Sequence, residues 1–184
     1  MNIDGIPTRT LRAHPAQNCI DIIDQTRLPH VLHWVRVATL EEAAHAIHSM
    51  QVRGAPLIGV TAAYGLALAL DFEASDRRLA EAAALLRSTR PTAVNLHWAL
   101  ARMESVLAPL PPAQRCAGAW AEAAAIADED VAQNTAIGER GLALWREQLA
   151  PRGDTLNVMT HCNAGWLATV DRGTALAPVY AAHD

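Results

Sequence analysis

Residues 156–165, with the sequence LNVMTHCNAG, decide how the rest of the chain is interpreted. Apolar residues give way to polar ones, the run ends at a glycine, and the small-residue segment 166–184 follows. This order is typical of a buried strand that leads through a turn into a helix. In an open parallel sheet, ligands bind at the carboxyl ends of the strands, where the next helix directs its positive end. We therefore expect a ligand site around Cys162, with a helix start that favours the thiolate form of this residue.

A buried structural thiol is the alternative interpretation of Cys162, because free cysteines are among the most buried residues. The other two cysteines, Cys19 and Cys116, form no CxxC pair, so the spacing predicts neither a disulfide framework nor a zinc site. Unpaired cysteines are typical of a reducing compartment, and the first residues lack the apolar core of a signal peptide. We therefore expect a cytoplasmic protein.

The composition indicates a globular domain with a sizeable core. Hydrophobic residues make up 51% of the 184 residues and charged residues 18%, which argues against disorder. The net charge of −4 and the lack of a Lys/Arg cluster argue against a nucleic-acid binder. The most apolar run, residues 55–70, is shorter than the roughly 18–20 residues that span a bilayer. We interpret this run as a buried core helix and expect no membrane association.

The pattern before residue 150 predicts a small β element followed by a helical bundle. Short strands or a hairpin are expected within residues 3–23, and another strand within residues 30–37. Thr39 and Glu42 form a capping box for the first helix, and Gly54 and Pro56 mark the boundary with the second. Further helices are expected at residues 75–87, 93–107 and 113–149.

The fold class is therefore α/β, in two parts. Residues 1–150 are expected to form an amino-terminal domain of β-hairpin and helical bundle, and residues 151–184 to provide the first strand and helix of a Rossmann-like domain. A single strand leaves both of its hydrogen-bonding edges bare, and parallel pairing needs a second strand across a crossover connection. The second domain is thus expected to be incomplete, so that the chain is a fragment, a gene remnant, or completed by a partner.

Three segments share one design, in which a polar or basic residue stands just ahead of an expected helix start. They are RGAP from Arg53, RPTAVN from Arg90, and HCNAG from His161. Helix amino termini bind anions through free N–H groups, and an arginine adds bidentate contacts to a phosphate. Together the segments predict a small phosphorylated substrate, although a single arginine is more often a surface residue.

These motifs resemble the methylthioribose-1-phosphate isomerases of methionine salvage. The resemblance rests on RGAPLIGVTAAYGLALA, RPTAVNL, THCNAG and GTAL, together with IIDQTRLPH at residues 22–30 and IADEDVAQNTAIGERG at residues 126–141. These six segments stand in the family's order and cover essentially the whole chain, but only the first half of the family's usual length. The resemblance implies an aldose–ketose isomerase that converts 5-methylthioribose 1-phosphate to 5-methylthioribulose 1-phosphate. It implies no metal or organic cofactor, and a homodimer.

The resemblance also assigns the site residues. The positions that match the family's two substrate-binding segments are Arg53, Gly54, Ala55 and Arg90. Cys162 matches the catalytic cysteine, and we assign it as the proton donor and acceptor. Its neighbours that we expect to line the pocket are His161, Asn163 and Gly165. The family's catalytic aspartate lies beyond residue 184, so we expect the chain alone to be inactive or nearly so.

Other interpretations stay open at this point. The family is related to ribose-1,5-bisphosphate isomerases and to the non-catalytic regulatory subunits of the translation-initiation exchange factor, and a gene remnant without a stable fold is a further alternative. The cysteine motif beside RGAP and RPTAVNL favours the isomerase. His45 and His48 have a spacing that can hold a metal, but no carboxylate or cysteine accompanies them, so no metal site is expected. The acidic run 128–130 is expected to lie on a solvated helix face.

Overall fold

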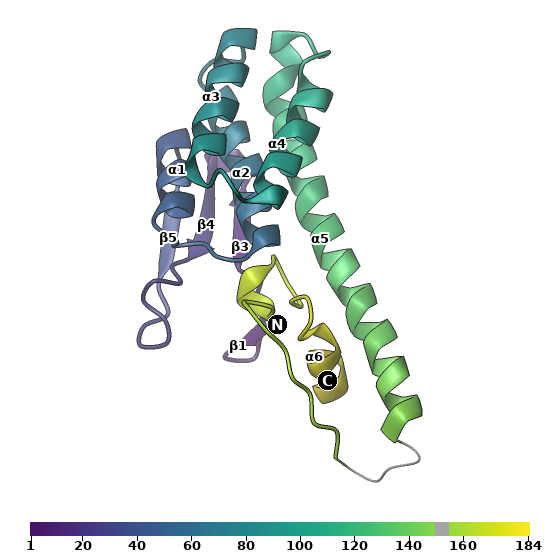
Figure 1. The fold of residues 1–184 in the computed structure, drawn as a ribbon. Helices are drawn as coiled ribbons and strands as arrows, with labels where there is room; N and C mark the ends of the chain where they lie inside the picture. The colour runs from purple at the N-terminus through teal and green to yellow at the C-terminus, as the bar shows by residue number, and fades with distance from the viewer. Residues whose placement is uncertain (150–154) are drawn as a thin grey trace.

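The computed structural model describes residues 1–149 and 155–184 of the chain (Figure 1). The amino-terminal part carries five short strands, β1 (Asn2–Ile3), β2 (Ile6–Pro7), β3 (Leu11–His14), β4 (Cys19–Ile23) and β5 (Trp34–Val37). β1 and β2 form an antiparallel hairpin, and β4 lies between β3 and β5 in a second antiparallel sheet. The small β element predicted from the sequence is therefore confirmed.

A helical bundle follows this sheet. Its helices are α1 (Leu40–His48), α2 (Ala55–Leu70), α3 (Asp76–Thr89), α4 (Val94–Leu107) and α5 (Pro112–Leu149), and the chain ends with α6 (Ala177–His183). The predicted helices are confirmed, because the local signals act as expected. Thr39 accepts a hydrogen bond from the backbone N–H of Glu42 in a complete capping box, and Ser75 accepts one from that of Arg78.

Helix α2 is the centre of the molecule. Every residue from Leu57 to Leu70 is buried, and the helix packs against α1, α3, α4 and α5 (Figure 1). A helix that is apolar on all sides has no solvent face, so the other helices must surround it. The first turn of α2 begins at Ala55, so the core helix also fixes the position of the RGAP motif.

The carboxyl-terminal segment lies along the lower half of α5, with α6 packed against that helix (Figure 1). A Cβ atom on Gly141 would lie only 2.3 Å from Cγ of Pro178, so the small residue lets the two helices approach closely. Upstream of α6, the backbone N–H of Val170 donates to the Asp130 carboxylate at 2.8 Å, and that of Thr10 donates to the Val170 carbonyl at 3.0 Å. The segment is thereby held between β3 and α5.

The strand predicted to begin at Leu156 and to lead into the Cys162 turn does not form. Residues 155–160 are exposed and irregular, because a strand needs a neighbour with which to pair and the described residues supply none there. The helix predicted directly after the cysteine is also absent; a three-residue 3₁₀-helix, Trp166–Ala168, stands there, and α6 begins only at Ala177. The α/β class is confirmed, whereas the expected domain boundary at residues 150–151 lies outside the described residues.

None of the helices in the described part of the chain combines the length and the apolarity that crossing a membrane requires.

Candidate functional site

A cavity of about 660 Å³ brings the three predicted segments together. It lies where the starts of α2 and α4 meet the carboxyl-terminal segment. The sequence-predicted residues that line it are Arg53, Gly54, Ala55, Arg90, Cys162 and Asn163. The other two candidates, His161 and Gly165, do not line this cavity, although His161 adjoins Cys162, which does.

The RGAP turn is shaped by Gly54, which caps α2. Its φ of 91° lies in a region that favours glycine, and its carbonyl accepts the N–H of Ile58 at 3.0 Å. A Cβ atom at this position would lie 2.3 Å from Cα of Ala168, so the turn packs directly on the carboxyl-terminal segment. Arg53 is therefore held at the cavity by a helix start on one side and by this close backbone contact on the other.

Arg90 stands in the connection between α3 and α4. Its carbonyl accepts the N–H of Ala93 at 3.0 Å, and Ala93 caps α4 by accepting the N–H of His97 at 3.2 Å. The Nε2 atom of His97 lies 2.9 Å from the carbonyl oxygen of Pro91, within hydrogen-bond distance. These bonds order the connection, so the half-buried Arg90 lines the cavity from a defined turn.

Cys162 lies on an exposed turn with a φ of 69°. The turn is anchored just beyond it, because the Ala164 carbonyl accepts the N–H groups of Thr174 at 3.0 Å and Leu176 at 3.2 Å. The alternative of a buried structural thiol is wrong, because Cys162 is exposed. The expected helix start beside Cys162 is also wrong, because only the three-residue 3₁₀-helix Trp166–Ala168 follows and α6 begins at Ala177.

Further residues of the cavity were not singled out from the sequence. Asn95 and Thr174 stand inside the motifs RPTAVNL and GTAL, so the motifs located them without indicating a role. The remaining wall is largely apolar, and most of it also belongs to these motifs: Pro56 and Ile58 follow Arg53, and Ala93 and Val94 stand in RPTAVNL. Met50 lies outside every motif, and nothing in the sequence marks it as part of a site.

No metal-binding group of three or more histidine, cysteine, aspartate or glutamate side chains occurs within residues 1–149 and 155–184. His45 and His48 are exposed on α1. The acidic run is not uniformly solvated, because Asp130 is half-buried against Val170 and desolvation raises the pKa of its carboxyl group.

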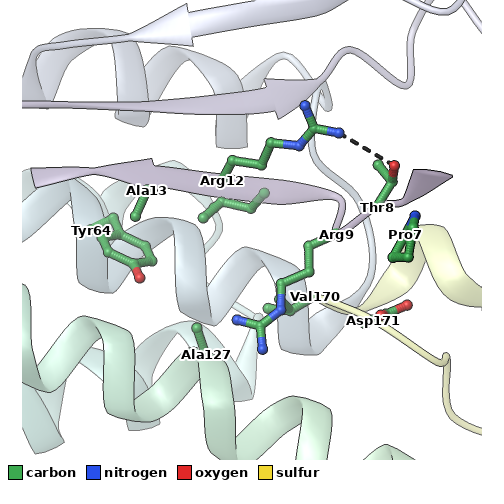
Figure 2. Close-up of a pocket in the computed structure, with 10 residues that line it drawn as sticks. Pro7, Thr8, Arg9, Arg12, Ala13, Tyr64, Ala127, Val170 and Asp171 are labelled. Atoms are coloured by element: carbon green, nitrogen blue, oxygen red, sulfur yellow. Dashed lines mark hydrogen bonds between the residues drawn. The ribbon is translucent and has the colours of Figure 1, made fainter. Parts of the chain in front are cut away.

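A second cavity, of about 510 Å³, lies between β3, α2 and α5 and contains none of the predicted site residues (Figure 2). Arg9 reaches across it toward α5, where its guanidinium donates to the Asp128 carboxylate at 2.8 Å. Tyr64 forms part of the wall, and burial raises the pKa of its hydroxyl to about 12. The second arginine of the lining, Arg12, donates to the Thr8 hydroxyl at 3.3 Å, and the Asp171 carboxylate also lines the cavity. Because both arginines already have partners and a carboxylate lies beside them, this cavity offers less to an anion than the first one.

Comparisons with known proteins agree with the motifs. The initiation factor 2 subunit family matches residues 51–184. A methylthioribose-1-phosphate isomerase of Dechloromonas aromatica is 80% identical over 184 residues, covering 100% of this chain and 51% of that protein. One from Methylobacterium nodulans is 59% identical, covering 100% of this chain and 50% of that protein. The chain thus spans about half the length of the curated relatives it matches.

Solved structures share the fold. The crystal structure of 5-methylthioribose 1-phosphate isomerase from Pyrococcus horikoshii matches with a TM-score of 0.82 and 35% identity, covering 96% of this chain and 49% of that chain. The translation initiation factor eIF-2B, subunit delta, from A. fulgidus matches with a TM-score of 0.81 and 38% identity, covering 96% and 51%. The resemblance to the isomerases is confirmed, and the chain belongs to the initiation factor 2 subunit family.

Proposed function

We propose that this chain supplies the phosphate-binding residues and one catalytic residue of an aldose–ketose isomerase that converts 5-methylthioribose 1-phosphate to 5-methylthioribulose 1-phosphate. One observation carries the proposal: the two arginine turns and the Cys162 turn line the same cavity. The names of the most similar relatives support the same reaction.

The chemistry requires an anion site beside a proton-transfer group. A phosphate on carbon 1 prevents simple opening of the sugar ring, so the enzyme must hold that phosphate while hydrogen moves between carbons 1 and 2. In this proposal Arg53 and Arg90 bind the phosphate or sugar oxygens, and the backbone of Gly54 and Ala55 adds the N–H groups of a helix start. Cys162 donates and accepts the proton.

The lining also favours a sugar with one phosphate over a bisphosphate. Arg53 and Arg90 are the cationic side chains among the described residues that line the cavity, and the wall beside them is apolar. A single phosphate matches the two arginines, and an apolar methylthio group matches a wall that includes Met50 and Ile58.

A non-catalytic regulatory module is the second candidate, because the A. fulgidus initiation-factor structure matches with a TM-score of 0.81. Such a module would bind a phosphorylated ligand without needing the Cys162 thiol.

We further propose a homodimer in a reducing cytoplasm. In that setting the three free cysteines would stay unpaired.

A chimera tests the proposed reaction. This chain is joined to the part of the Dechloromonas aromatica relative that it does not match, and isomerisation of 5-methylthioribose 1-phosphate is measured. We expect turnover by the chimera, and a loss of about 10²–10⁴-fold in kcat in Cys162→Ser, because one acid–base group contributes that much. Cys116→Ser is the matched control and should keep full activity. Equal turnover by the two variants would contradict the role of Cys162, and no turnover by the chimera would favour the regulatory module. Turnover by the chain alone at the chimera's rate would contradict the assignment of half a site.

A further inference from the structure

The motif IIDQTRLPH contains a buried side chain that the proposed reaction does not use. Gln25 follows β4 and is 8% exposed. Its side-chain Nε2 donates to the Leu167 carbonyl at 2.7 Å, and its backbone N–H donates to the Gln51 carbonyl at 2.9 Å. One residue therefore bonds two segments that are more than a hundred positions apart in the sequence.

Both of these segments lead directly into the cavity. Gln51 stands two residues before Arg53, and Leu167 lies in the 3₁₀-helix that follows the Cys162 turn. The same two segments meet a second time where Gly54 packs on Ala168. The segments that carry the Arg53 turn and the Cys162 turn are thus joined to each other by a side-chain hydrogen bond and a glycine contact, in addition to the bonds that hold the carboxyl-terminal segment to Thr10 and Asp130.

The hydrogen bond itself is held in place. Asp24, which is 4% exposed, accepts hydrogen bonds from the backbone N–H of Thr26 at 3.0 Å and from its hydroxyl at 2.6 Å. The backbone N–H of Asp24 donates to the His33 carbonyl at 2.9 Å. Bonds on both sides of Gln25 therefore limit the motion of its backbone. The fixed backbone keeps the side-chain amide of Gln25 within reach of the Leu167 carbonyl.

We propose that Gln25 is a positioning residue, which sets the Cys162 turn against the Arg53 turn and thereby preorganises the cavity for its phosphorylated ligand. The bond is partly shielded from solvent, and a shielded carbonyl that loses its donor is destabilised, so removing the Gln25 amide weakens the contact between the two segments. The part of the inference that concerns the ligand rests on the proposed function, whereas the part that concerns the two turns does not.

The test variant is Gln25→Met, which keeps the length of the side chain and the backbone hydrogen bond but removes the amide. Thr10→Val is the matched control, because the buried Thr10 hydroxyl donates to the Thr169 carbonyl at 2.6 Å and anchors the same carboxyl-terminal segment without contacting Gln51. Gln25→Asn, whose side chain is one methylene too short for the bond, replaces the methionine variant if that one does not fold.

Amide hydrogen exchange of the ligand-free chain is the first measurement, made at temperatures that give equal folded fractions. We expect Gln25→Met to speed exchange of the Ala168 and Ile58 amides together, by about tenfold, which corresponds to the loss of one hydrogen bond. Thr10→Val should leave Ile58 unchanged. Unchanged exchange at both amides in Gln25→Met, or the same changes in both variants, would overturn the inference.

Calorimetric titration with 5-methylthioribose 1-phosphate is the second measurement. We expect Gln25→Met to weaken the affinity by about tenfold and Thr10→Val to weaken it less than about twofold, because a preorganised site avoids the cost of ordering on binding. If the unmodified chain does not bind the sugar phosphate, the proposed function fails and the exchange experiment still decides the role of Gln25. If the unmodified chain binds and both variants bind equally well, the positioning role fails alone.

Discussion

The three cysteines differ in their exposure to solvent and in their hydrogen-bond partners. Cys162 is exposed on its turn, whereas Cys19 is 2% exposed in the core. Cys116 is half-buried, and its thiol donates to the Asp71 carboxylate at 2.9 Å. That hydrogen bond and burial raise the pKa of Cys116 to about 11, because the neighbouring carboxylate disfavours the thiolate.

This contrast predicts the order of alkylation. At pH 8 a thiol with a pKa near 11 is ionised on the order of one part in a thousand, and the thiolate is the form that reacts. We expect iodoacetamide to modify Cys162 first in the native chain, with Cys116 and Cys19 reacting only after unfolding. Mass spectrometry of timed peptide digests measures the order, and early modification of Cys116 would contradict the described environments.

Gly54 yields a second prediction for a single residue. Gly54→Ala places a Cβ 2.3 Å from Cα of Ala168 at a φ of 91°, so the expected loss in the free energy of unfolding is about 3 kcal/mol or more from strain and overpacking. Gly5→Ala is the control, since Gly5 has a φ of 77° but no atom within 4 Å of its Cβ position. It should lose only about 1–2 kcal/mol, from backbone strain. Equal losses in urea unfolding would mean that the RGAP turn does not pack on Ala168.

Among the secondary-structure elements, the small sheet carries a pH-dependent ion pair. Arg36 on β5 donates to Asp21 on β4 at 3.0 Å, and this hydrogen bond lowers the pKa of the Asp21 carboxyl group. A lowered carboxyl pKa contributes stability above its value in the unfolded chain, and this stability is lost as the pH falls through the folded value. The Asp21 side chain is 22% exposed and that of Arg36 58%, so solvent screening keeps the contribution small.

Asp21→Asn is therefore expected to lower the free energy of unfolding by about 0.2–1 kcal/mol at pH 7 and by nothing measurable at pH 2. Urea unfolding at the two pH values measures the difference. Asp4→Asn serves as the control, since Asp4 is exposed on the β1–β2 turn and forms no ion pair with the described residues. A loss that persists at pH 2 would show that Asp21 acts through packing and not through its charge.

Most elements could be predicted from the sequence because their signals are local. The capping box at Thr39, the cap at Ser75 and the all-apolar run of α2 each act within one or two helical turns. The strand expected between Leu156 and the Cys162 turn could not be predicted from such local signals, because a strand depends on partners distant in the sequence. Its apolar residues are half in solvent here, with Val158 45% exposed and Met159 96%.

The site was predicted to a similar extent. Arginine and cysteine motifs identified six lining residues, since charged and nucleophilic side chains stand out in a sequence. The role of Met50 and Ile58 in the apolar wall could not be predicted, although Ile58 stands inside the motif that begins at Arg53, because the apolar residues of a cavity wall are of the same types as those of a core. The hydrogen bond from the Gln25 side chain to the Leu167 carbonyl could not be predicted, because only the folded chain brings these two positions together.

At the scale of the whole molecule, the site depends on how the carboxyl-terminal segment docks on the bundle. The Val170 backbone is bonded to Asp130 of α5 and to Thr10 ahead of β3, while Ala168 packs on Gly54. These contacts bring Cys162 to the cavity lined by Arg53 and Arg90, although no helix or strand contains it. Tertiary docking therefore replaces the local strand–turn–helix arrangement that the sequence suggested.

Protection of Cys162 from alkylation tests most directly whether the three turns form one site. The rate of iodoacetamide modification is measured in the native chain with increasing 5-methylthioribose 1-phosphate, and again in Arg53→Ala, in Arg90→Ala and in the surface control Arg77→Ala. The account predicts saturable protection in the unmodified chain and in Arg77→Ala, with at least about tenfold weaker protection in each of the other two variants, because a charge-assisted phosphate contact contributes about 1.5–3 kcal/mol. Modification of Cys162 at one rate at every sugar-phosphate concentration, or protection in Arg53→Ala and Arg90→Ala equal to that in Arg77→Ala, would contradict it.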